Sequence, residues 1–464
     1  MLSLDDTIAA ISTPIGEGGI GIVRMTGPDA VSILCQVFRP SRATHLDSQP
    51  STFSLIPNHL HYGHIVDPVT ADVVDEVLAV HMPAPRTYTR QDVVEINGHG
   101  GIFALRRLLS VCLRQGARLA EPGEFTARAF LNGRLDLAQA EAVLDVVRAK
   151  TGKQLDAAVG QLVGRLSEEV RSVRAMLVGD LAHLEASIDF AEDEIPERDI
   201  GPDLTQASDR LSRLLADADR GIVYRQGVRA AIVGRPNVGK SSLLNRLLRT
   251  SRAIVTDIPG TTRDTLEETL NLQGVPVVLV DTAGIADAIR DPIEQMGIER
   301  SREALAQADL ALLVLDASQP LNEADRSIAA LIGDKPTLVV MNKVDLREMS
   351  PYDPSEILSA RSISISALTG AGLEKLEEAI LETVFSGQVV ASEAPMVTSP
   401  RHKEALTRAL EHVQAAHASH QADLVADLVA IDLMAAINAL GEITGQTASD
   451  DLLETIFGTF CIGK

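Results

Sequence analysis

Residues 234–241 read GRPNVGKS, which matches the pattern G-x-x-x-x-G-K-[ST] of a phosphate-binding loop. The apolar run before it, at 228–233, predicts a strand, and the leucine-rich stretch at 242–248 predicts a helix. Glycines let backbone N–H groups approach phosphate oxygens, and the helix N-terminus adds positive partial charge. We therefore expect Lys240 to reach the β- and γ-phosphates of a nucleotide and the Ser241 hydroxyl to bind Mg²⁺.

Two later strand ends indicate which base the nucleotide carries. The apolar run at 337–341 predicts a strand that leads to Asn342, Lys343 and Asp345. A carboxylate at Asp345 can accept hydrogen bonds from guanine N1–H and the guanine N2 amino group, a donor pair that adenine lacks. Small residues after a last predicted strand, at 366–368, are expected to cap the base. These motifs predict a guanine-nucleotide domain.

A third strand end predicts the γ-phosphate side of the site. The apolar run at 277–280 ends at Asp281, where a carboxylate can support Mg²⁺ and the N–H of Gly284 can bind a γ-phosphate. Many related GTPases place a water-orienting Gln directly after this sequence, but position 285 is isoleucine. Another polar group must then orient the water, and the following segment, 286–299, offers four acids: Asp287, Asp291, Glu294 and Glu299.

Two further stretches of the sequence offer oxygen ligands for metal ions. The carbonyl oxygen of Asn237 can bind a monovalent cation beside the phosphates, or Asn237 can serve only to stabilise the loop turn. A cation there would supply charge that an arginine finger supplies in other GTPases. Residues 256–264, TDIPGTTRD, offer threonine hydroxyls for Mg²⁺ and carbonyls for a second ion, and we expect them to form the first switch.

Composition sets limits on the class of protein. The 464 residues exceed one ordinary core, and the net charge of −22 excludes nucleic-acid binding by bulk electrostatics. The three cysteines are widely spaced, which predicts neither a disulfide framework nor a zinc site and favours a reducing cytoplasm. We expect no membrane association, because the sequence has no transmembrane run and the N-terminus is not signal-like.

The elements that must position these residues fall into three regions. Residues 1–121 show short strands, at 19–24, 73–80 and 93–96, and a helix at 104–115, which predicts an α+β domain. Residues 122–220 become helical, with amphipathic stretches at 135–150 and 167–190 and an acidic loop at 190–199. The α/β nucleotide domain is expected at 221–386.

Helical periodicity returns after the nucleotide domain. It extends from 400 to 440 and again from 450 to 457, within a region that we assign to 387–464. We infer that the nucleotide domain is inserted into one all-α domain made from both flanks, and two separate helical domains are the alternative. The terminal Cys461 lies fourth from the end, as in a prenylation box, but the terminal lysine is a poor match to that motif.

Two glycine clusters in the first region have weaker meaning. Residues 16–21 match G-x-G-x-x-G, but a predicted strand follows instead of a helix, so we favour a tight turn over a dinucleotide site. Residues 97–101 read NGHGG, and we interpret His99 as structural.

The chain resembles the MnmE (TrmE) family of tRNA-modification GTPases over its whole length. The resemblance rests on DTIA at 6–9, GGIGIVR at 18–24, DVVEINGHGG at 92–101, the long stretch PGEFTARAFLNGRLDLAQAE at 122–141, the motifs of the G domain, and CIGK at 461–464. It implies a multidomain chain with a Ras-like P-loop G domain inserted into the helical domain. It also implies a cytoplasmic homodimer, formed through the N-terminal domain.

The resemblance implies a reaction and its partners. With the FAD-containing protein MnmG, in a heterotetramer, the family adds an aminomethyl-type group, typically carboxymethylaminomethyl, at C5 of wobble uridine 34 of certain tRNAs. The one-carbon unit comes from 5-formyl- or methylene-tetrahydrofolate, and GTP hydrolysis is coupled to dimerisation of the G domains. Family folate contacts fall on Arg24, Glu95, Arg134 and Lys464, although the family often has Lys where Arg134 stands. Cys461 is implicated in activity.

Similarity also assigns the ions and the nucleotide contacts. Potassium is placed on Asn237, Thr256, Ile258 and Thr261, and Mg²⁺ on Ser241 and Thr262, while Glu294 positions the attacking water and Lys240 is the other catalytic residue. The residues expected to bind GTP are Asn237, Val238, Gly239, Lys240, Ser241, Ser242, Thr256, Asp257, Ile258, Pro259, Gly260, Thr261, Thr262, Asp281, Thr282, Ala283, Gly284, Asn342, Lys343, Asp345, Ser366, Ala367 and Leu368.

Two other classes of protein compete with this interpretation. A ribosome-assembly GTPase often carries a KH-like module or a second G domain, and the sequence shows neither a basic G-x-x-G tail nor a second phosphate-binding loop. A dynamin-like membrane remodeller would need a basic amphipathic surface, against which the acidic balance argues.

Overall fold

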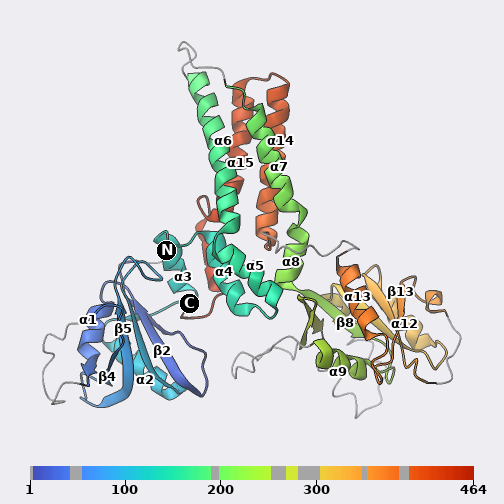
Figure 1. Cartoon of the computed structure of the whole chain (residues 1–464), viewed down its shortest axis with the longest axis horizontal. Coiled ribbons are helices and arrows are strands. Elements are labelled where there is room, and N and C mark those ends of the chain that lie inside the picture. The colour runs from blue at the N-terminus through green and yellow to red at the C-terminus, as the bar shows by residue number, and fades with distance from the viewer. Residues whose placement is uncertain are drawn as a thin grey trace.

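The computed structural model describes residues 4–41, 55–189, 198–251, 268–280, 302, 304–346, 353–385 and 397–463. The molecule has three parts, and a long helical bundle lies between an N-terminal lobe and a second lobe (Figure 1). In sequence, the second lobe is inserted between the two halves of the bundle. The chain enters the bundle, leaves it for the inserted lobe and returns, as the green and red helices lying together in the bundle show.

The N-terminal lobe is an α+β domain with one seven-stranded sheet. Its strand order is β3-β4-β5-β6-β2-β1-β7, and adjacent strands are antiparallel except for β1 and β7. The predicted strands and helix are all present in this lobe. Its elements are β1 (Ile8–Ile11), β2 (Gly18–Thr26), α1 (Ala30–Val37), β3 (Phe38–Pro40), β4 (His61–Val66), β5 (Val73–Met82), β6 (Val93–Gly100), α2 (Ile102–Arg114) and β7 (Arg118–Leu119).

The two glycine clusters of this lobe lie side by side. Gly18 pairs with Gly100 and Gly21 with Gly98 across strands β2 and β6, so the first cluster leads into a strand as predicted. A Cβ at Gly21 would overlap the Leu105 side chain, so the absence of a side chain there lets α2 pack closely on the sheet. His99 is exposed, and its Nδ1 lies 2.7 Å from Asp75 Oδ1, a surface pair that agrees with a structural role.

Helices from both flanks of the inserted lobe form one bundle. The same buried core contains Val173 and Leu177 of α6, Leu211 of α7, Val413 of α14 and Leu433 of α15, which favours the single helical domain over two. The helices of this region are α3 (Glu124–Leu131), α4 (Leu137–Arg148), α5 (Gly152–Leu162), α6 (Arg165–Asp189), α7 (Gly201–Ala216), α8 (Ala218–Gln226), α14 (Pro400–Gln421), α15 (Ala426–Thr444) and α16 (Asp450–Gly458).

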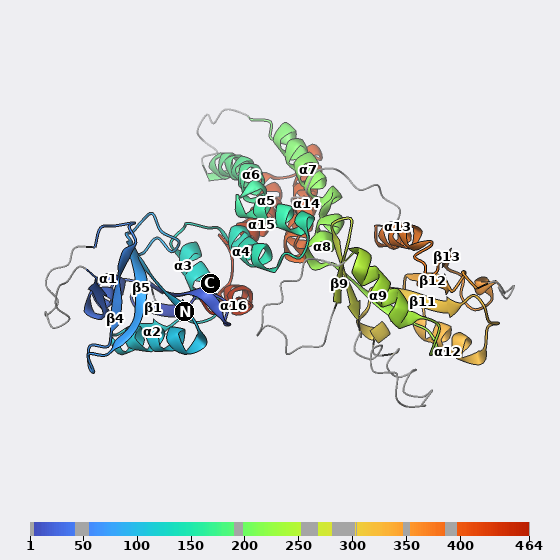
Figure 2. The same ribbon diagram turned by 60° about the horizontal axis from the view of Figure 1, so that its bottom comes forward.

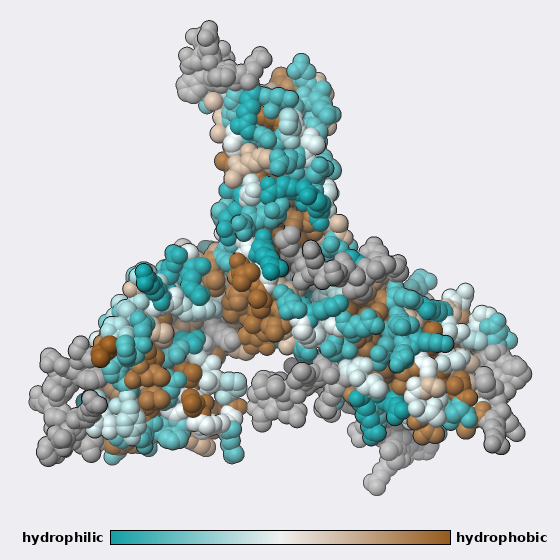
Figure 3. Space-filling view, in the orientation of Figure 1, coloured by the Kyte–Doolittle hydropathy of each residue, from teal (hydrophilic) through white to brown (hydrophobic). Residues whose placement is uncertain are grey.

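The periodic stretch expected from 400 to 440 is two helices. The chain reverses between α14 and α15, where Asp423 has a φ of 54°. The apolar period continues across the turn because both helices bury a stripe in the same core. Toward its foot, the bundle surface shows an apolar patch in the region of α4 and α5, brown in Figure 3. The exposed large hydrophobic residues of these two helices and of the C-cap of α5 are Val147, Leu155, Val159 and Val163.

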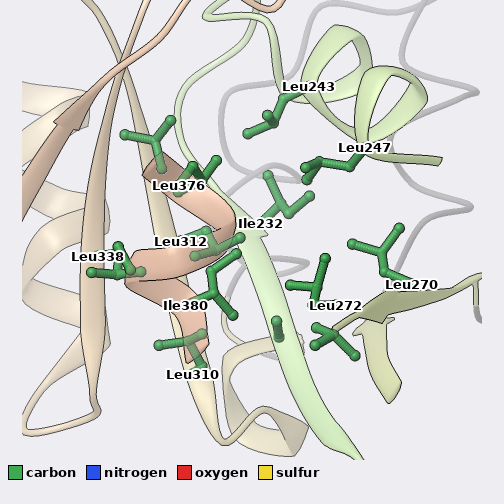
Figure 4. Close-up of a cluster of buried hydrophobic side chains, with 14 of the residues drawn as sticks. Ile232, Leu243, Leu247, Leu270, Leu272, Leu310, Leu312, Leu338, Leu376 and Ile380 are labelled. Atoms are coloured by element: carbon green, nitrogen blue, oxygen red, sulfur yellow. The ribbon is translucent and has the colours of Figure 1, made fainter. Parts of the chain in front are cut away.

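The inserted lobe is an α/β domain with a six-stranded sheet in the order β13-β12-β11-β8-β10-β9. All neighbours are parallel except β9 and β10, which form a hairpin. Leucines and isoleucines of the sheet interlock with those of α9 and α13 (Figure 4). The elements are β8 (Val228–Val233), α9 (Lys240–Ser251), β9 (Glu268–Leu272), β10 (Val275–Val280), β11 (Leu310–Asp316), α12 (Glu323–Ile332), β12 (Thr337–Asn342), η1 (Pro354–Glu356), β13 (Arg361–Ser364) and α13 (Leu373–Val384).

Candidate functional site

The phosphate-binding loop joins the centre of this sheet to α9. It leaves the carboxyl end of β8, which has β10 on one side and β11 on the other, a point where ligands of open α/β sheets bind. Gly234 and Gly239 have φ values of 152° and 101°, and a Cβ at Gly234 would overlap the carbonyl of Val314. Asn237 is exposed and has a φ of 65°, so its peptide follows the left-handed turn that a cradle of N–H groups requires.

Lys240 begins α9 and folds back over the loop. Its Nζ donates to the carbonyl oxygens of Gly234 at 2.7 Å and Arg235 at 2.8 Å. Burial lowers the pKa of Lys240 to about 8. The ammonium is thus held at the loop on which the phosphates are expected, and a bound anion there would raise the pKa of Lys240 again.

Asn342 connects two loops of the site. Its Nδ2 donates to the carbonyl of Val238 at 2.9 Å, and its Oδ1 accepts from the N–H of Ala367 at 2.9 Å. A Cβ at Gly239 would overlap the Asn342 amide, so glycine at that position lets the two loops approach. Asn342 is buried, and its two hydrogen bonds set the distance between the phosphate-binding loop and the base-capping loop.

A buried acid that the sequence analysis missed lies beside these loops. Asp316 ends β11, and its Oδ2 accepts from Lys343 Nζ at 2.7 Å. Burial raises the pKa of Asp316, but hydrogen bonds from Lys343 and Ser318 outweigh burial and leave that pKa below its usual value. The sequence carries a signal for Asp316, because an acid at the end of an apolar strand is the same pattern that indicates Asp281. The pair orients the Lys343 side chain at the site.

A cavity of about 460 Å³ opens between the base-recognition loops and α9. Asp345 lines it, as do Ala367 and the strongly exposed Leu368, in agreement with a base-binding pocket. Helix α9 adds Arg246, whose Nη2 donates to the carbonyl of Thr369 at 2.9 Å, a residue that sequence motifs did not identify. The lining residues are Gly239, Ser242, Asn245, Arg246, Arg249, Asn342, Lys343, Asp345, Leu346, Ala367 and Leu368.

The remaining predicted nucleotide contacts divide into two groups. Ser241 and Ser242 lie in the first turn of α9, and Ser366 stabilises its own loop by accepting from the N–H of Thr369 at 3.1 Å. The predicted residues of the first switch, the Asp281 segment and Glu294 lie outside the described residues, as does Lys464. The outside residues are Thr256, Asp257, Ile258, Pro259, Gly260, Thr261, Thr262, Asp281, Thr282, Ala283, Gly284 and Glu294.

Three of the predicted folate residues have contacts in or against the N-terminal lobe. Arg24 and Glu95 face each other across β2 and β6, with Arg24 Nη2 2.7 Å from Glu95 Oε1. The Arg134 guanidinium carbon lies 4.8 Å from the centroid of the Tyr88 ring. Burial raises the pKa of Tyr88, while a hydrogen bond to Thr126 and the charges of Arg134 and Arg24 oppose that rise. Arg134 thus lies over the Tyr88 ring, which the sequence did not single out, whereas the Arg24 guanidinium carbon lies 6.0 Å from the centroid of the Phe125 ring.

The C-terminal tail returns to this lobe. The carbonyl of Cys461 accepts from the N–H of Gly123, and Ile462 forms a β-bridge with Pro122. Ser12 Oγ donates to the carbonyl of Gly463 at 3.1 Å. Cys461 is exposed, and its position is thereby tied to α3 and to the end of β1. In Figure 2 the C-terminus lies beside α3 and α16.

The loops around β8, β11, β12 and β13 define a P-loop GTPase domain. Family models match the MnmE helical domain at residues 137–461 and the N-terminus of the GTP-binding protein TrmE at residues 7–134. The tRNA modification GTPase MnmE of Roseiflexus castenholzii is 51% identical over 99% of this chain and 99% of its own length. The protein of the same name from Chloroflexus aurantiacus is 50% identical over 99% of this chain and 100% of its own length.

The chain belongs to the MnmE family of tRNA modification GTPases. Among solved structures, the G domain of the FeoB iron transporter of T. maritima is 30% identical, covering 34% of this chain and 98% of that one, with a TM-score of 0.26. No helix within the described residues is both long and apolar enough to cross a membrane.

Proposed function

We propose that this GTPase acts in the cytoplasm with an FAD-containing partner of the MnmG type on certain tRNAs. It uses a tetrahydrofolate one-carbon unit to add an aminomethyl-type group, typically carboxymethylaminomethyl, at C5 of wobble uridine 34. Membership in a family of tRNA modification GTPases supports the tRNA substrate. The observations that support the one-carbon chemistry are the Arg24–Glu95 ion pair beside the Phe125 ring and the Arg134 guanidinium over the Tyr88 ring.

These residues fit a folate by their chemistry. The guanidinium groups of Arg24 and Arg134 suit the carboxylates of the glutamate tail, and Glu95 can accept from pterin N–H groups. Tyr88 adds an aromatic face. The folate supplies the one-carbon unit when bound, while this chain's residues orient it and hold its charges. Lys464 is proposed to complete the set, and Cys461 to take part in the activity.

Calorimetric titration with 5-formyltetrahydrofolate tests the site. Arg24→Ala should weaken binding by about tenfold or more, since a charge-assisted hydrogen bond contributes ~1.5–3 kcal/mol. Arg106→Ala, at an exposed position of α2, is the matched control and should bind as wild type. Nucleoside analysis of wobble uridines from cells lacking the protein tests the reaction, and an unchanged profile would leave only the GTPase.

The hydrolytic site is proposed to use both a monovalent and a divalent cation. Asn237 is placed at the exposed rim of the phosphate loop, where its oxygen can bind K⁺ together with Thr256, Ile258 and Thr261. Mg²⁺ would be held by Ser241, in the first turn of α9, and by Thr262. Each cation supplies positive charge at the phosphates, and Glu294 orients the attacking water.

Ion substitution and one variant test this arrangement. GTP turnover should rise in K⁺ and respond poorly to Na⁺, and equal rates in the two salts would remove the role of Asn237. Glu294→Ala should keep GTP binding and lose most turnover. Full turnover in Glu294→Ala would transfer the water-positioning role to another acid of residues 286–299.

The N-terminal lobe is proposed to form the homodimer. Helices α1 and α2 cover one face of its sheet, and the other face leaves Ile20, Tyr62 and Leu78 66%, 51% and 39% exposed. Such an apolar sheet face is a favourable surface for a second copy. G domains of the two copies would then meet across their nucleotide faces during hydrolysis. Sedimentation of Ile20→Asp should shift toward the monomer.

A further inference from the structure

The end of α4 and the turn that follows it contact two regions that the proposed function must coordinate. One is the tail that bears Cys461, and the other is the β9–β10 hairpin of the GTPase domain. In Figures 1 and 2, helices α4 and α5 lie between the two lobes. The contacts on each side are made by residues only a few positions apart in sequence.

The tail side is held by a side chain and by packing. Arg148 Nη2 donates to the carbonyl of Thr459 at 2.9 Å, two residues before Cys461. Phe457 and Phe460 pack in one cluster with Leu137 and Leu144 of α4. A displacement of α4 along its axis would therefore be carried into the tail by a polar contact and by close-packed rings.

The GTPase side is held at both ends of β9. Lys150 Nζ donates to Thr269 Oγ1 at 3.0 Å, near the start of that strand. Thr151 Oγ1 donates to the carbonyl of Gly274 at 2.8 Å, in the turn between β9 and β10. Glycine at 274 has a φ of 97°, and a Cβ there would overlap the Lys153 side chain. Two contacts at separate points restrain both sliding and tilting of the hairpin.

The same turn is braced against the bundle. Gln154 Nε2 donates to the carbonyl of Arg225 at 2.8 Å, and Arg225 Nε lies 2.8 Å from Asp145 Oδ2 of α4. Thr151 is also the N-cap of α5, where its Oγ1 accepts from the N–H of Gln154 at 3.2 Å. The turn is consequently a rigid piece of the helical domain, able to transmit a displacement instead of absorbing it.

The β9–β10 hairpin lies in sequence between the two segments that are expected to contact the γ-phosphate side of the site. The strand β9 follows the predicted first switch at 256–264, and β10 ends at Val280, directly before Asp281. Thr269 and Val278 are paired across the hairpin, so both strands move together if either is displaced. A change at the γ-phosphate that acts on Asp281 would reach the hairpin through its own backbone.

We propose that Arg148, Lys150 and Thr151 form a mechanical link that transmits the nucleotide state of the GTPase domain to the Cys461 tail. The link rests on the proposed function, because it assigns a route for the coupling between hydrolysis and modification. Lys150 and Thr151 are positioning residues: the contacts given for them within the described residues are with the hairpin and with α5, not with a predicted nucleotide or folate residue, and they act through the hairpin and α4.

Hydrogen–deuterium exchange on the full-length protein tests the link. With GDP and with a non-hydrolysable GTP analogue, wild type should show different exchange at residues 268–280 and at 457–463. Thr151→Val should keep the nucleotide response of 268–280 and lose that of 457–463, with GTP turnover unchanged. Thr151→Ser retains the hydroxyl and should restore the tail response, which separates the link from a general loss of structure.

Two further variants remove the other contacts of the link, one on the tail side and one on the hairpin side. Arg148→Ala and Lys150→Ala change exposed side chains, so both proteins should fold, and both should uncouple the tail. Lys375→Ala, at an exposed lysine of α13, is the control and should respond as wild type. Wild type should bind 5-formyltetrahydrofolate with affinities that differ by about fivefold or more between the GDP state and the GTP-analogue state, as in typical allosteric coupling. In Thr151→Val the ratio of these two affinities should approach one.

The outcomes separate this inference from the proposed function. A tail response that persists in Thr151→Val, Lys150→Ala and Arg148→Ala would overturn the link, as would a wild-type tail that ignores the nucleotide. A wild-type protein that does not bind the folate but whose tail responds through Thr151 would reject the folate site and keep the link.

Discussion

The side-chain amide of Asn342 donates to the backbone carbonyl of Val238 at 2.9 Å and so joins the end of β12 to the phosphate-binding loop. The same amide accepts from Ala367. A residue that motif analysis assigns to guanine binding thus also sets the spacing of three loops. Its contribution to affinity should be indirect as well as direct.

Asn342→Ala should weaken GTP and GDP binding by a similar factor. Two buried hydrogen bonds are lost and the Val238 carbonyl is left without this donor, at a cost of ~1–3 kcal/mol, or about 5- to 150-fold in affinity. Fluorescent-nucleotide titration of both ligands measures the effect. Lys375→Ala, at an exposed position of α13 outside the cavity lining, is the control. A loss confined to GTP would show that Asn342 acts on the γ-phosphate side.

Asp345→Asn should change the base that the site prefers. An amide can accept from N1–H but presents a donor to the guanine N2 amino group, whereas the 2-oxo group of xanthine can accept from that donor. GTP should therefore bind about 100-fold more weakly or worse, while XTP binding should improve, since sites built on paired hydrogen bonds discriminate strongly. Competition titrations with GTP, XTP and ATP measure the preference, and an unchanged order of affinities would break the base-readout argument.

Nucleotide binding should take up protons above pH 8. Burial lowers the pKa of Lys240 to about 8, and the negative phosphates of a bound nucleotide should raise that pKa again. At pH 8.5 a large part of the free protein carries a neutral Lys240 that becomes protonated on binding, whereas at pH 6.5 it is already charged. Calorimetry in buffers of different ionisation enthalpy measures the uptake. Uptake of equal size at pH 6.5 and 8.5 would assign it to another group.

The foot of the bundle contains a buried ionic cluster that should make stability depend on pH. Glu141 Oε2 lies 2.8 Å from His402 Nε2, and Oε1 accepts from Arg401 Nε at 2.9 Å. Burial opposes the charge on Glu141, but its two partners outweigh burial and lower its pKa to about 2. Burial lowers the pKa of His402, although the contact with Glu141 works against that shift.

Both folded pKa values lie below the unfolded ones, so the unfolded state binds more protons and stability falls as pH falls. The loss should begin near the ordinary value of 6.5 for His402 and continue through 4.5 toward 2 for Glu141. Glu141→Gln should lower the free energy of unfolding at pH 7, with a gap to wild type that narrows below pH 4.5. Urea unfolding measures it, with Glu382→Gln, at an exposed ion pair, as the control.

The positions of the loops at the nucleotide site could be predicted from sequence because the spacing within a phosphate-binding loop or a base-recognition loop is dictated by short-range geometry. Gly234, Lys240 and Asp345 are examples, and so are the strands that precede them. The single helical domain was also inferred correctly from periodicity on both flanks. Periodicity does not predict the turn between α14 and α15 at Asp423, because the same apolar stripe continues on both sides of the turn.

What could not be predicted depends on residues distant in sequence. Tyr88 meets Arg134 only because α3 and its flanking turns pack over the N-terminal sheet. Arg148 meets Thr459 across 311 positions, and Lys150 meets Thr269 across 119. No local pattern records such pairs, since each side chain is equally compatible with an exposed position on an amphipathic helix or loop.

The cavity lined by Arg246, Arg249 and Lys343 has a consequence for kinetics in a chain whose net charge is −22. Among the described residues here, these three cations are accompanied by two carboxylates, those of Asp345 and of Asp316, which pairs with Lys343, so one positive charge remains and the local potential opposes the sign of the molecule as a whole. An incoming nucleoside triphosphate would be repelled at long range and attracted near the cavity. Added salt weakens the outer repulsion first, so capture of the nucleotide should be fastest at an intermediate ionic strength.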